Sequence, residues 1–92
     1  MARGPREKPA RLAEKLLQIR LALGLSQSEM LRRLGAEDRI AYNRISEFET
    51  GKGEPSLIIL LEYARVAGVC VDVLIDDARD LPAKLPAKPK HS

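Results

Sequence analysis

Apolar residues recur along this chain at helical spacing, and no stretch alternates in the manner of a strand. A first helix is predicted over residues 9–23, with Pro9 in its first turn and Gly24 just past its end. Its inward face consists of four residues spaced three or four apart, namely Leu12, Leu16, Ile19 and Leu23. The first quarter of the chain is therefore expected to be one amphipathic helix.

A second helix is predicted to begin after Ser26. Ser26 is a favoured N-cap residue, and Glu29 three positions later completes the pattern of a capping box. Met30 and Leu34 give this helix its inward face, and Gly35 ends it.

Three further helices are predicted in the second half of the chain. The third covers about residues 41–49, with Ile45 and Phe48 pointing inward and Gly51 as its stop. The fourth covers residues 56–67, and its apolar stripe is Leu57, Leu60, Leu61 and Ala64. A short fifth helix follows over about residues 71–75. The predicted fold is all-α, with five short helices around one small core.

Composition limits the class of protein. The chain has 92 residues, 45% of them hydrophobic and 32% charged, which is typical of one small globular domain. Tyr42, Phe48 and Tyr63 are its only aromatic residues, so a stacking platform for single strands or RNA is not expected. The single cysteine, Cys70, excludes an internal disulfide and a cysteine-based zinc site, and fits a cytoplasmic protein.

The basic balance of the chain lies in its two ends. Residues 1–11 carry four basic side chains against one acidic, and residues 82–92 carry three lysines and no acid. We therefore expect a basic flexible arm over 1–8, a folded domain over 9–79 and a Pro/Lys-rich disordered tail over 80–92, which contains the repeat "LPAKLPAK". A basic arm of this kind either tracks phosphate or is simply a solvated end.

Several classes of function are not expected. The apolar stretch 56–75 is interrupted by Glu62, Arg65 and Asp72, so no membrane span is predicted. The acidic stretch "DVLIDDARD" lacks the ligand spacing of a calcium loop. The one histidine, His91, lies in the tail and offers no base to a nucleophile. We expect no enzyme activity, no cofactor and no metal.

Three stretches in this order carry a resemblance: "IRLALGLSQSEMLRRLG", "ISEFETGKGEPSL" and "LLEYARVAGVCVDVLI". Together they make the chain similar to the XRE-type helix-turn-helix family, which includes phage Cro and repressor proteins. The resemblance implies a five-helix, phage-repressor-like fold with the helix-turn-helix at the second and third helices. It also implies a sequence-specific transcriptional regulator of double-stranded DNA, with the helix at about 41–49 entering the major groove.

The same resemblance implies roles for individual residues. The family's base-reading positions fall on Tyr42, Asn43, Arg44 and Glu47, and its DNA-backbone positions on Ser26, Gln27, Thr50 and Lys52. Arg44 suits guanine and Asn43 suits adenine, whereas Glu47 would either accept from cytosine or orient Arg44; for each of these residues, mere solvent exposure is the alternative. Arg20 and Glu49 match the family's structural ion pair.

The chain departs from the family between its second and third helices. Fourteen positions separate Gly35 from Glu49, about four more than is usual where a short turn joins the two helices. Leu31 stands where the family has a small residue. We infer that the extra residues and Leu31 are linked, with Ile40 covering Leu31, and that the start of the recognition helix is affected.

Charge and surface leave two functions open. Residues 26–52 carry five basic and five acidic side chains, so the basic arm would have to supply phosphate contacts, or the acids must be paired or face away. A homodimer is typical of the family, and the fifth-helix region offers an apolar surface, Val69, Val71, Val73 and Ile75, unless these residues only close the core. The rival function is a protein-interaction module, such as an antitoxin-like or scaffold domain that binds a protein partner.

Overall fold

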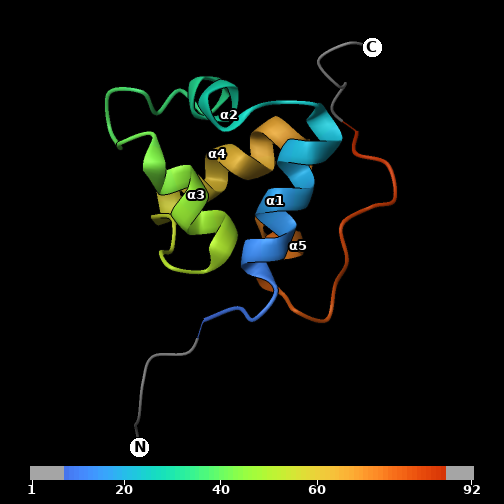
Figure 1. Cartoon of the computed structure of the whole chain (residues 1–92). Helices are drawn as coiled ribbons and strands as arrows, with labels where there is room; N and C mark the ends of the chain where they lie inside the picture. Colours follow the sequence, from blue (N-terminus) through green and yellow to red (C-terminus); the bar gives the residue numbers. More distant parts are fainter. Residues whose placement is uncertain (1–7, 87–92) are drawn as a thin grey trace, which may run out of the picture.

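A computed structural model describes residues 8–86, and within them the chain forms five helices and no strand (Figure 1). The helices are α1 (Leu12–Leu23), α2 (Gln27–Arg33), α3 (Asn43–Thr50), α4 (Leu57–Ala67) and α5 (Val71–Ile75). The all-α prediction is confirmed. Residues 1–7 of the expected basic arm and residues 87–92 of the expected tail lie outside the described part of the chain.

Local signals set most helix ends. Ser26 caps α2, since its Oγ accepts from the Glu29 amide at 3.1 Å while Glu29 Oε1 accepts from the Ser26 amide at 2.8 Å. Gly24 ends α1 with a φ of +72°, a left-handed conformation that suits glycine. The Ser26 oxygen and the Gly24 conformation thus close the α1–α2 junction as the sequence pattern indicates.

Two helices begin later than predicted. α1 starts at Leu12 rather than Pro9, and the amides of the preceding Ala10 and Arg11 bond to the Asp77 carboxylate, which lies 66 to 67 residues further along the chain. α3 starts at Asn43 rather than near residue 41, and Tyr42 occupies its N-cap position without a side-chain cap. Without a capping side chain, the sequence carries no sharp signal for that start.

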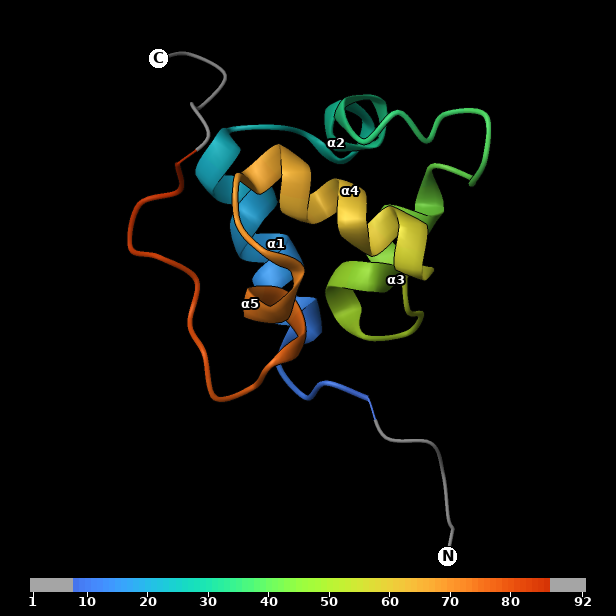
Figure 2. The same ribbon diagram turned by 180° about the vertical axis from the view of Figure 1, so that it is seen from behind.

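α1 lies at the centre of the domain and packs against α3, α4 and α5, while α2 packs on α3 (Figures 1 and 2). Ile45 and Phe48 of α3 are buried as predicted. The rest of the core is aliphatic apart from Met30 and Tyr63, and its best-buried members are Leu16, Ile19, Leu23, Leu34, Ala36, Ala67 and Leu74. The core therefore holds the inner face of α3 against α1 and α2, as is required of a helix whose outer face is to meet a partner.

The predicted apolar stripe of α4 is wrong at Leu57. The buried face is instead Ile59, Leu60, Tyr63, Ala64 and Ala67. Because Tyr63 occupies the centre of this face, Leu57 lies at the edge of the face and is 83% exposed. Leu61 is only half-buried. Leu57 and its neighbour Ile58, which is 55% exposed, therefore form an apolar surface at the start of α4.

Lys15 is a fully buried charged residue on the inward face of α1. Its Nζ donates to the carbonyl of Val73 at 2.8 Å and to that of Asp76 at 3.0 Å. These carbonyls lie at the end of α5, where a helix has acceptors without intrahelical donors and where positive charge is favoured. Lys15 therefore fastens α5 to α1.

A second fastening joins the start of α1 to the segment after α5. The Asp77 carboxylate accepts from the amide of Ala10 at 2.9 Å and from that of Arg11 at 3.0 Å. The Arg11 guanidinium lies 2.7 Å from Asp80. Arg11 is thus committed to the domain and is not a free cation of the basic arm.

Asp77 should make stability depend on pH in the acid range. Hydrogen bonds from the Ala10 and Arg11 amides hold the pKa of Asp77 below its ordinary value of 3.8. A lowered folded-state pKa means that its contribution is present above the ordinary value and is lost as pH falls through the folded-state value. We expect Asp77→Asn to lower the melting temperature near neutral pH, and the gap to the unaltered chain to shrink below about pH 4. A gap that stays constant with pH in thermal melts would contradict the capping role.

The apolar residues around α5 mostly close the core. Val73 is buried, Val69 and Val71 are half-buried against the core, and Ile75 is 44% exposed. Residues 80–86 form no helix. Their Leu81 and Leu85 nevertheless pack against the core beside α1, so this part of the Pro/Lys-rich segment lies on the domain (Figure 1).

Candidate nucleic-acid interface

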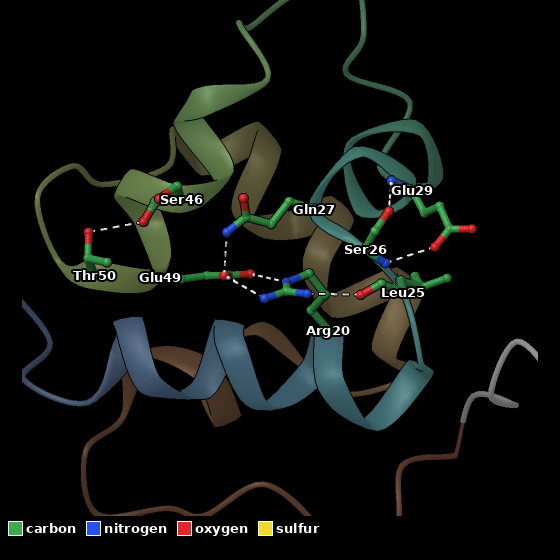
Figure 3. Close-up of polar contacts among 8 residues, drawn as sticks. All are labelled: Arg20, Leu25, Ser26, Gln27, Glu29, Ser46, Glu49 and Thr50. Atoms are coloured by element: carbon green, nitrogen blue, oxygen red, sulfur yellow. Dashed lines mark hydrogen bonds and ion pairs between the residues drawn. The ribbon is translucent and has the colours of Figure 1, made fainter.

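A partly buried polar network joins α1, α2 and α3 (Figure 3). The Arg20 guanidinium holds the Glu49 carboxylate through two nitrogens, Nε at 2.6 Å and Nη2 at 3.1 Å, and Nη1 donates to the carbonyl of Leu25. Gln27 Nε2 donates to the same carboxylate at 3.1 Å. Glu49 thus ties the end of α3 to the first helix and to the first residue of α2.

This network is shielded from water. The Glu49 side chain is 4% exposed and that of Arg20 is 15% exposed. The hydrogen bond to Glu49 raises the pKa of Arg20, which keeps its guanidinium charged. Nearby, burial of the Tyr63 hydroxyl, followed by the negative charge of Glu49, raises the pKa of Tyr63, and this hydroxyl has no hydrogen-bond partner among the described residues.

The N-terminus of α2 leaves hydrogen-bond donors free. Ser26 Oγ satisfies the Glu29 amide, while the amides of Gln27 and Ser28 have no acceptor within the described residues. Ser26 is exposed and retains its hydroxyl proton, and Gln27 Nε2 retains its second hydrogen. Ser26 and Gln27 are both predicted to contact the DNA backbone, and they lie side by side with donors suited to an anion.

The four residues predicted to read bases lie at the start and along the outer face of α3. Tyr42 is 70% exposed, and Asn43 is exposed at the first helical position. Arg44 and Glu47 form an ion pair with each other, and the Arg44 guanidinium lies 5.2 Å from the centre of the Phe48 ring. Tyr42 and Asn43 are thus presented to solvent, whereas Arg44 is oriented by Glu47.

Two residues at the end of the recognition helix and just after it, Thr50 and Lys52, are predicted to contact the DNA backbone. They differ in whether their donors are free. The Thr50 hydroxyl donates back to the carbonyl of Ser46 at 3.0 Å (Figure 3). It also lies 3.3 Å from the carbonyl of Glu47, so its proton is already used within α3. Lys52 is exposed in the loop that follows. Lys52 is the better placed of the two to meet an anion.

The extended turn between α2 and α3 packs on the core that contains Leu31. Leu31 is only 7% exposed, and Ile40 is half-buried against the core to which Leu31 belongs. Ala36, just after Gly35, is fully buried. The extra residues accordingly pack onto the domain at both ends of the turn.

The acidic side chains of the helix-turn-helix are largely engaged. Glu49 pairs with Arg20, Glu47 with Arg44, and Glu37 Oε2 lies 3.5 Å from Arg32 Nε. Glu29 serves in the α2 capping box. Residues 26–52 thus carry equal numbers of basic and acidic side chains, but most of the acids are engaged. Three cations there have no partner among the described residues, namely Arg33, Arg39 and Lys52.

Sequence reasoning missed Lys15 and Asp77. Lys15 stands three residues after Leu12 and four before Ile19, so the apolar spacing itself places it on the inward face. Asp77 belongs to the acidic stretch "DVLIDDARD", for which no site is predicted, and nothing local indicates its partner. No group of three or more potential metal ligands occurs within residues 8–86, and no helix there is long and apolar enough to cross a membrane.

A protein-family model described as helix-turn-helix matches residues 16–74. The chain belongs to this family, and the resemblance to its XRE-type members is confirmed. The family assignment agrees with the expectation of a non-enzymatic regulator. A comparison with curated proteins finds no match.

Solved structures share the fold. The P22 c2 repressor protein, in complex with a synthetic operator, is 21% identical over 72% of this chain and 94% of its own, with a TM-score of 0.62. SinR, a master regulator for biofilm formation in complex with DNA, is 26% identical over 68% of this chain and 95% of its own, with a TM-score of 0.58.

A chain from the complex of the SinR and SinI proteins is also similar. It is 26% identical over 73% of this chain and 62% of its own length, with a TM-score of 0.62. These three structures thus include two complexes with an operator or DNA and one complex between proteins.

Proposed function

We propose that this chain is a transcriptional regulator that binds double-stranded DNA sequence-specifically, with α3 in the major groove. The observation that carries the proposal is the presentation of α3. Its inner face is buried through Ile45 and Phe48, its end is held by Glu49, and Tyr42 and Asn43 stand exposed at its start. A helix read through its N-terminal residues needs this arrangement.

Phosphate contacts would come from the N-terminus of α2 and the loop after α3. The free amides of Gln27 and Ser28, with the Ser26 hydroxyl, offer donors to one phosphate. Lys52 adds a charge beyond the other end of α3. The basic arm over 1–8 is proposed to supply further phosphate or minor-groove contacts.

Base reading would rest on the four side chains at the start and along the outer face of α3. Asn43 at the start of α3 matches the adenine edge, and Arg44 matches the O6 and N7 acceptors of guanine. The ion pair with Glu47 favours the second of the two roles open to that residue, because it fixes the direction of the Arg44 fork. Tyr42 would meet a phosphate or a thymine methyl group.

The proposed function is tested by retention of duplexes from a random pool, followed by sequencing. We expect one enriched motif with two-fold symmetry, since we also propose that the chain binds as a homodimer through Ile75 and its surroundings. Half-sites should then lie about 34–36 Å apart, one helical turn of DNA. A failure to enrich any motif at low salt would argue against sequence-specific binding.

Arg44→Ala should relax the preference at one base pair of the enriched motif and weaken binding to it by about 1–3 kcal/mol. Arg44→Lys is the matched control, because lysine keeps the charge but lacks the two-pronged fork that recognises guanine. We expect the lysine variant to lose the same preference. If both variants keep the preference and bind all duplexes equally less well, Arg44 contacts phosphate instead.

A specific surface supports a second candidate function, binding of a protein partner. Leu57 and Ile58 at the start of α4 are 83% and 55% exposed, although apolar residues favour burial. A chain similar to this one occurs in the complex of the SinR and SinI proteins, which supports such a partner by analogy. Leu57→Asp should abolish capture of such a partner and leave binding to the enriched duplex unchanged.

A further inference from the structure

The turn between α2 and α3 is a built structure, and it projects beyond both helices (Figure 1). Ala36 is the first residue of the turn, and its amide donates to the carbonyl of Leu31 at 3.2 Å. The Ala36 carbonyl in turn accepts from the amides of Arg39 and Ile40, at 3.0 and 3.1 Å. Residues 36–40 therefore form one hydrogen-bonded turn.

Burial at the two ends of this turn determines which residues face outward. Ala36 is fully buried and Ile40 is half-buried against the core. The three residues between them, Glu37, Asp38 and Arg39, are exposed. The extra residues thus hold a short charged apex at the approach to the start of α3.

The charges at this apex are not equivalent. Glu37 lies 3.5 Å from Arg32, so its charge is partly offset. Arg39 forms no ion pair or hydrogen bond through its side chain with any residue the structure describes, and the same holds for Asp38. The apex therefore presents one available guanidinium with one acid beside it.

We propose that this turn is a further phosphate-contacting element, in which Arg39 binds the DNA backbone beside the start of α3; this rests on the proposed function. The major groove is about 12 Å wide and is filled by one α-helix with its side chains, so the two strands that border it lie close to the reading helix. α3 is proposed to enter by its N-terminal residues, and the turn that carries Arg39 leads directly into that end. Arg39 lies before one end and Lys52 beyond the other, so the two cations flank the reading helix.

The proposal is tested by neutralising two adjacent residues of opposite charge, one in each variant. Arg39→Gln removes one phosphate contact, so its affinity for the enriched duplex should fall about eightfold at 0.1 M salt and converge with that of the unaltered chain near 1 M. The slope of log K against log salt should become shallower by about 0.9. Asp38→Asn removes a charge that repels the same phosphate, and it should tighten binding about twofold.

The control for net charge is Arg65→Gln, which removes the same charge from the exposed surface of α4, where Arg65 pairs with Glu62 at 3.0 Å. We expect it to leave the salt slope unchanged. Melting temperatures should show that all three variants are folded, since each replaced side chain is exposed.

Different results overturn different claims. If the unaltered chain binds its duplex while Arg39→Gln and Asp38→Asn leave affinity and salt slope unchanged, the turn faces away from DNA and this proposal is wrong, although the proposed function stands. If Arg65→Gln weakens binding as much as Arg39→Gln, only net charge matters, and the proposal is again wrong. If the unaltered chain enriches no duplex, both fail.

Discussion

Replacing Glu49 by alanine is expected to destabilise the domain by about 3–5 kcal/mol, because the change leaves the Arg20 charge largely buried without its partner. The Glu49 carboxylate is 4% exposed and accepts from both Arg20 and Gln27. For a domain of this size such a loss corresponds to a fall in melting temperature of at least about 12 °C. A thermal melt followed by circular dichroism measures it.

The matched control is Glu47→Ala, on the same helix and two residues away. The side chains of its ion pair with Arg44 are 40% exposed (Arg44) and 36% exposed (Glu47), so the expected loss is below about 1 kcal/mol. A second check combines Glu49→Leu with Arg20→Met, which removes both charges; this double variant should be more stable than Glu49→Ala. An unchanged melting temperature for Glu49→Ala would show that the network does not hold the domain together.

The same network links stability to the proposed function. Glu49 fixes the end of α3, and through Gln27 it fixes the N-terminus of α2 whose amides are proposed to meet phosphate. The two halves of the interface are therefore set relative to each other by one carboxylate. An interface built in this way is ordered before DNA arrives, which favours recognition because less ordering entropy is lost on binding.

The sequence predicts those features of the fold that depend on neighbours in the chain. The capping box of Ser26 and Glu29, the stop at Gly51 and the inward residues Ile45 and Phe48 all follow from spacing alone. The start of α3 does not, because Tyr42 provides no capping side chain. Local signals fail where the helix end is set by the surrounding fold.

The error at Leu57 has a related cause. The run "SLIILLEYA" is apolar around much of the helix, so periodicity does not choose between its two apolar faces. Packing of Tyr63 against the core makes the choice and leaves Leu57 outside. Within the candidate site, in contrast, the pairing of Arg44 with Glu47 is visible from the sequence, because residues three apart on a helix are neighbours.

Lys15 shows what sequence patterns cannot supply. Its spacing places it inside the domain, but its acceptors belong to Val73 and Asp76, which lie 58 and 61 residues further along the chain. A buried ammonium is tolerated only where such acceptors exist. The identity of those acceptors depends on how α5 returns to α1, which is a property of the whole fold.

Lys15→Met should destabilise the domain by about 2–3 kcal/mol and should loosen α5 first. Methionine keeps the apolar stem but removes the donor, so the carbonyls of Val73 and Asp76 lose a charged hydrogen-bond partner at the end of α5. The melting temperature should fall, and amide hydrogen exchange should speed up more in α5 than in the centre of α1, since a locally weakened element opens before the whole domain.

The matched control is Lys52→Met, which removes the same charge from an exposed loop and should change stability by less than about 0.5 kcal/mol. Because Ile75 on α5 belongs to the proposed homodimer surface, Lys15→Met should also weaken binding to a two-half-site duplex more than to a single half-site. Equal exchange rates in α5 for the variant and the unaltered chain would show that the buried ammonium does not fasten this helix.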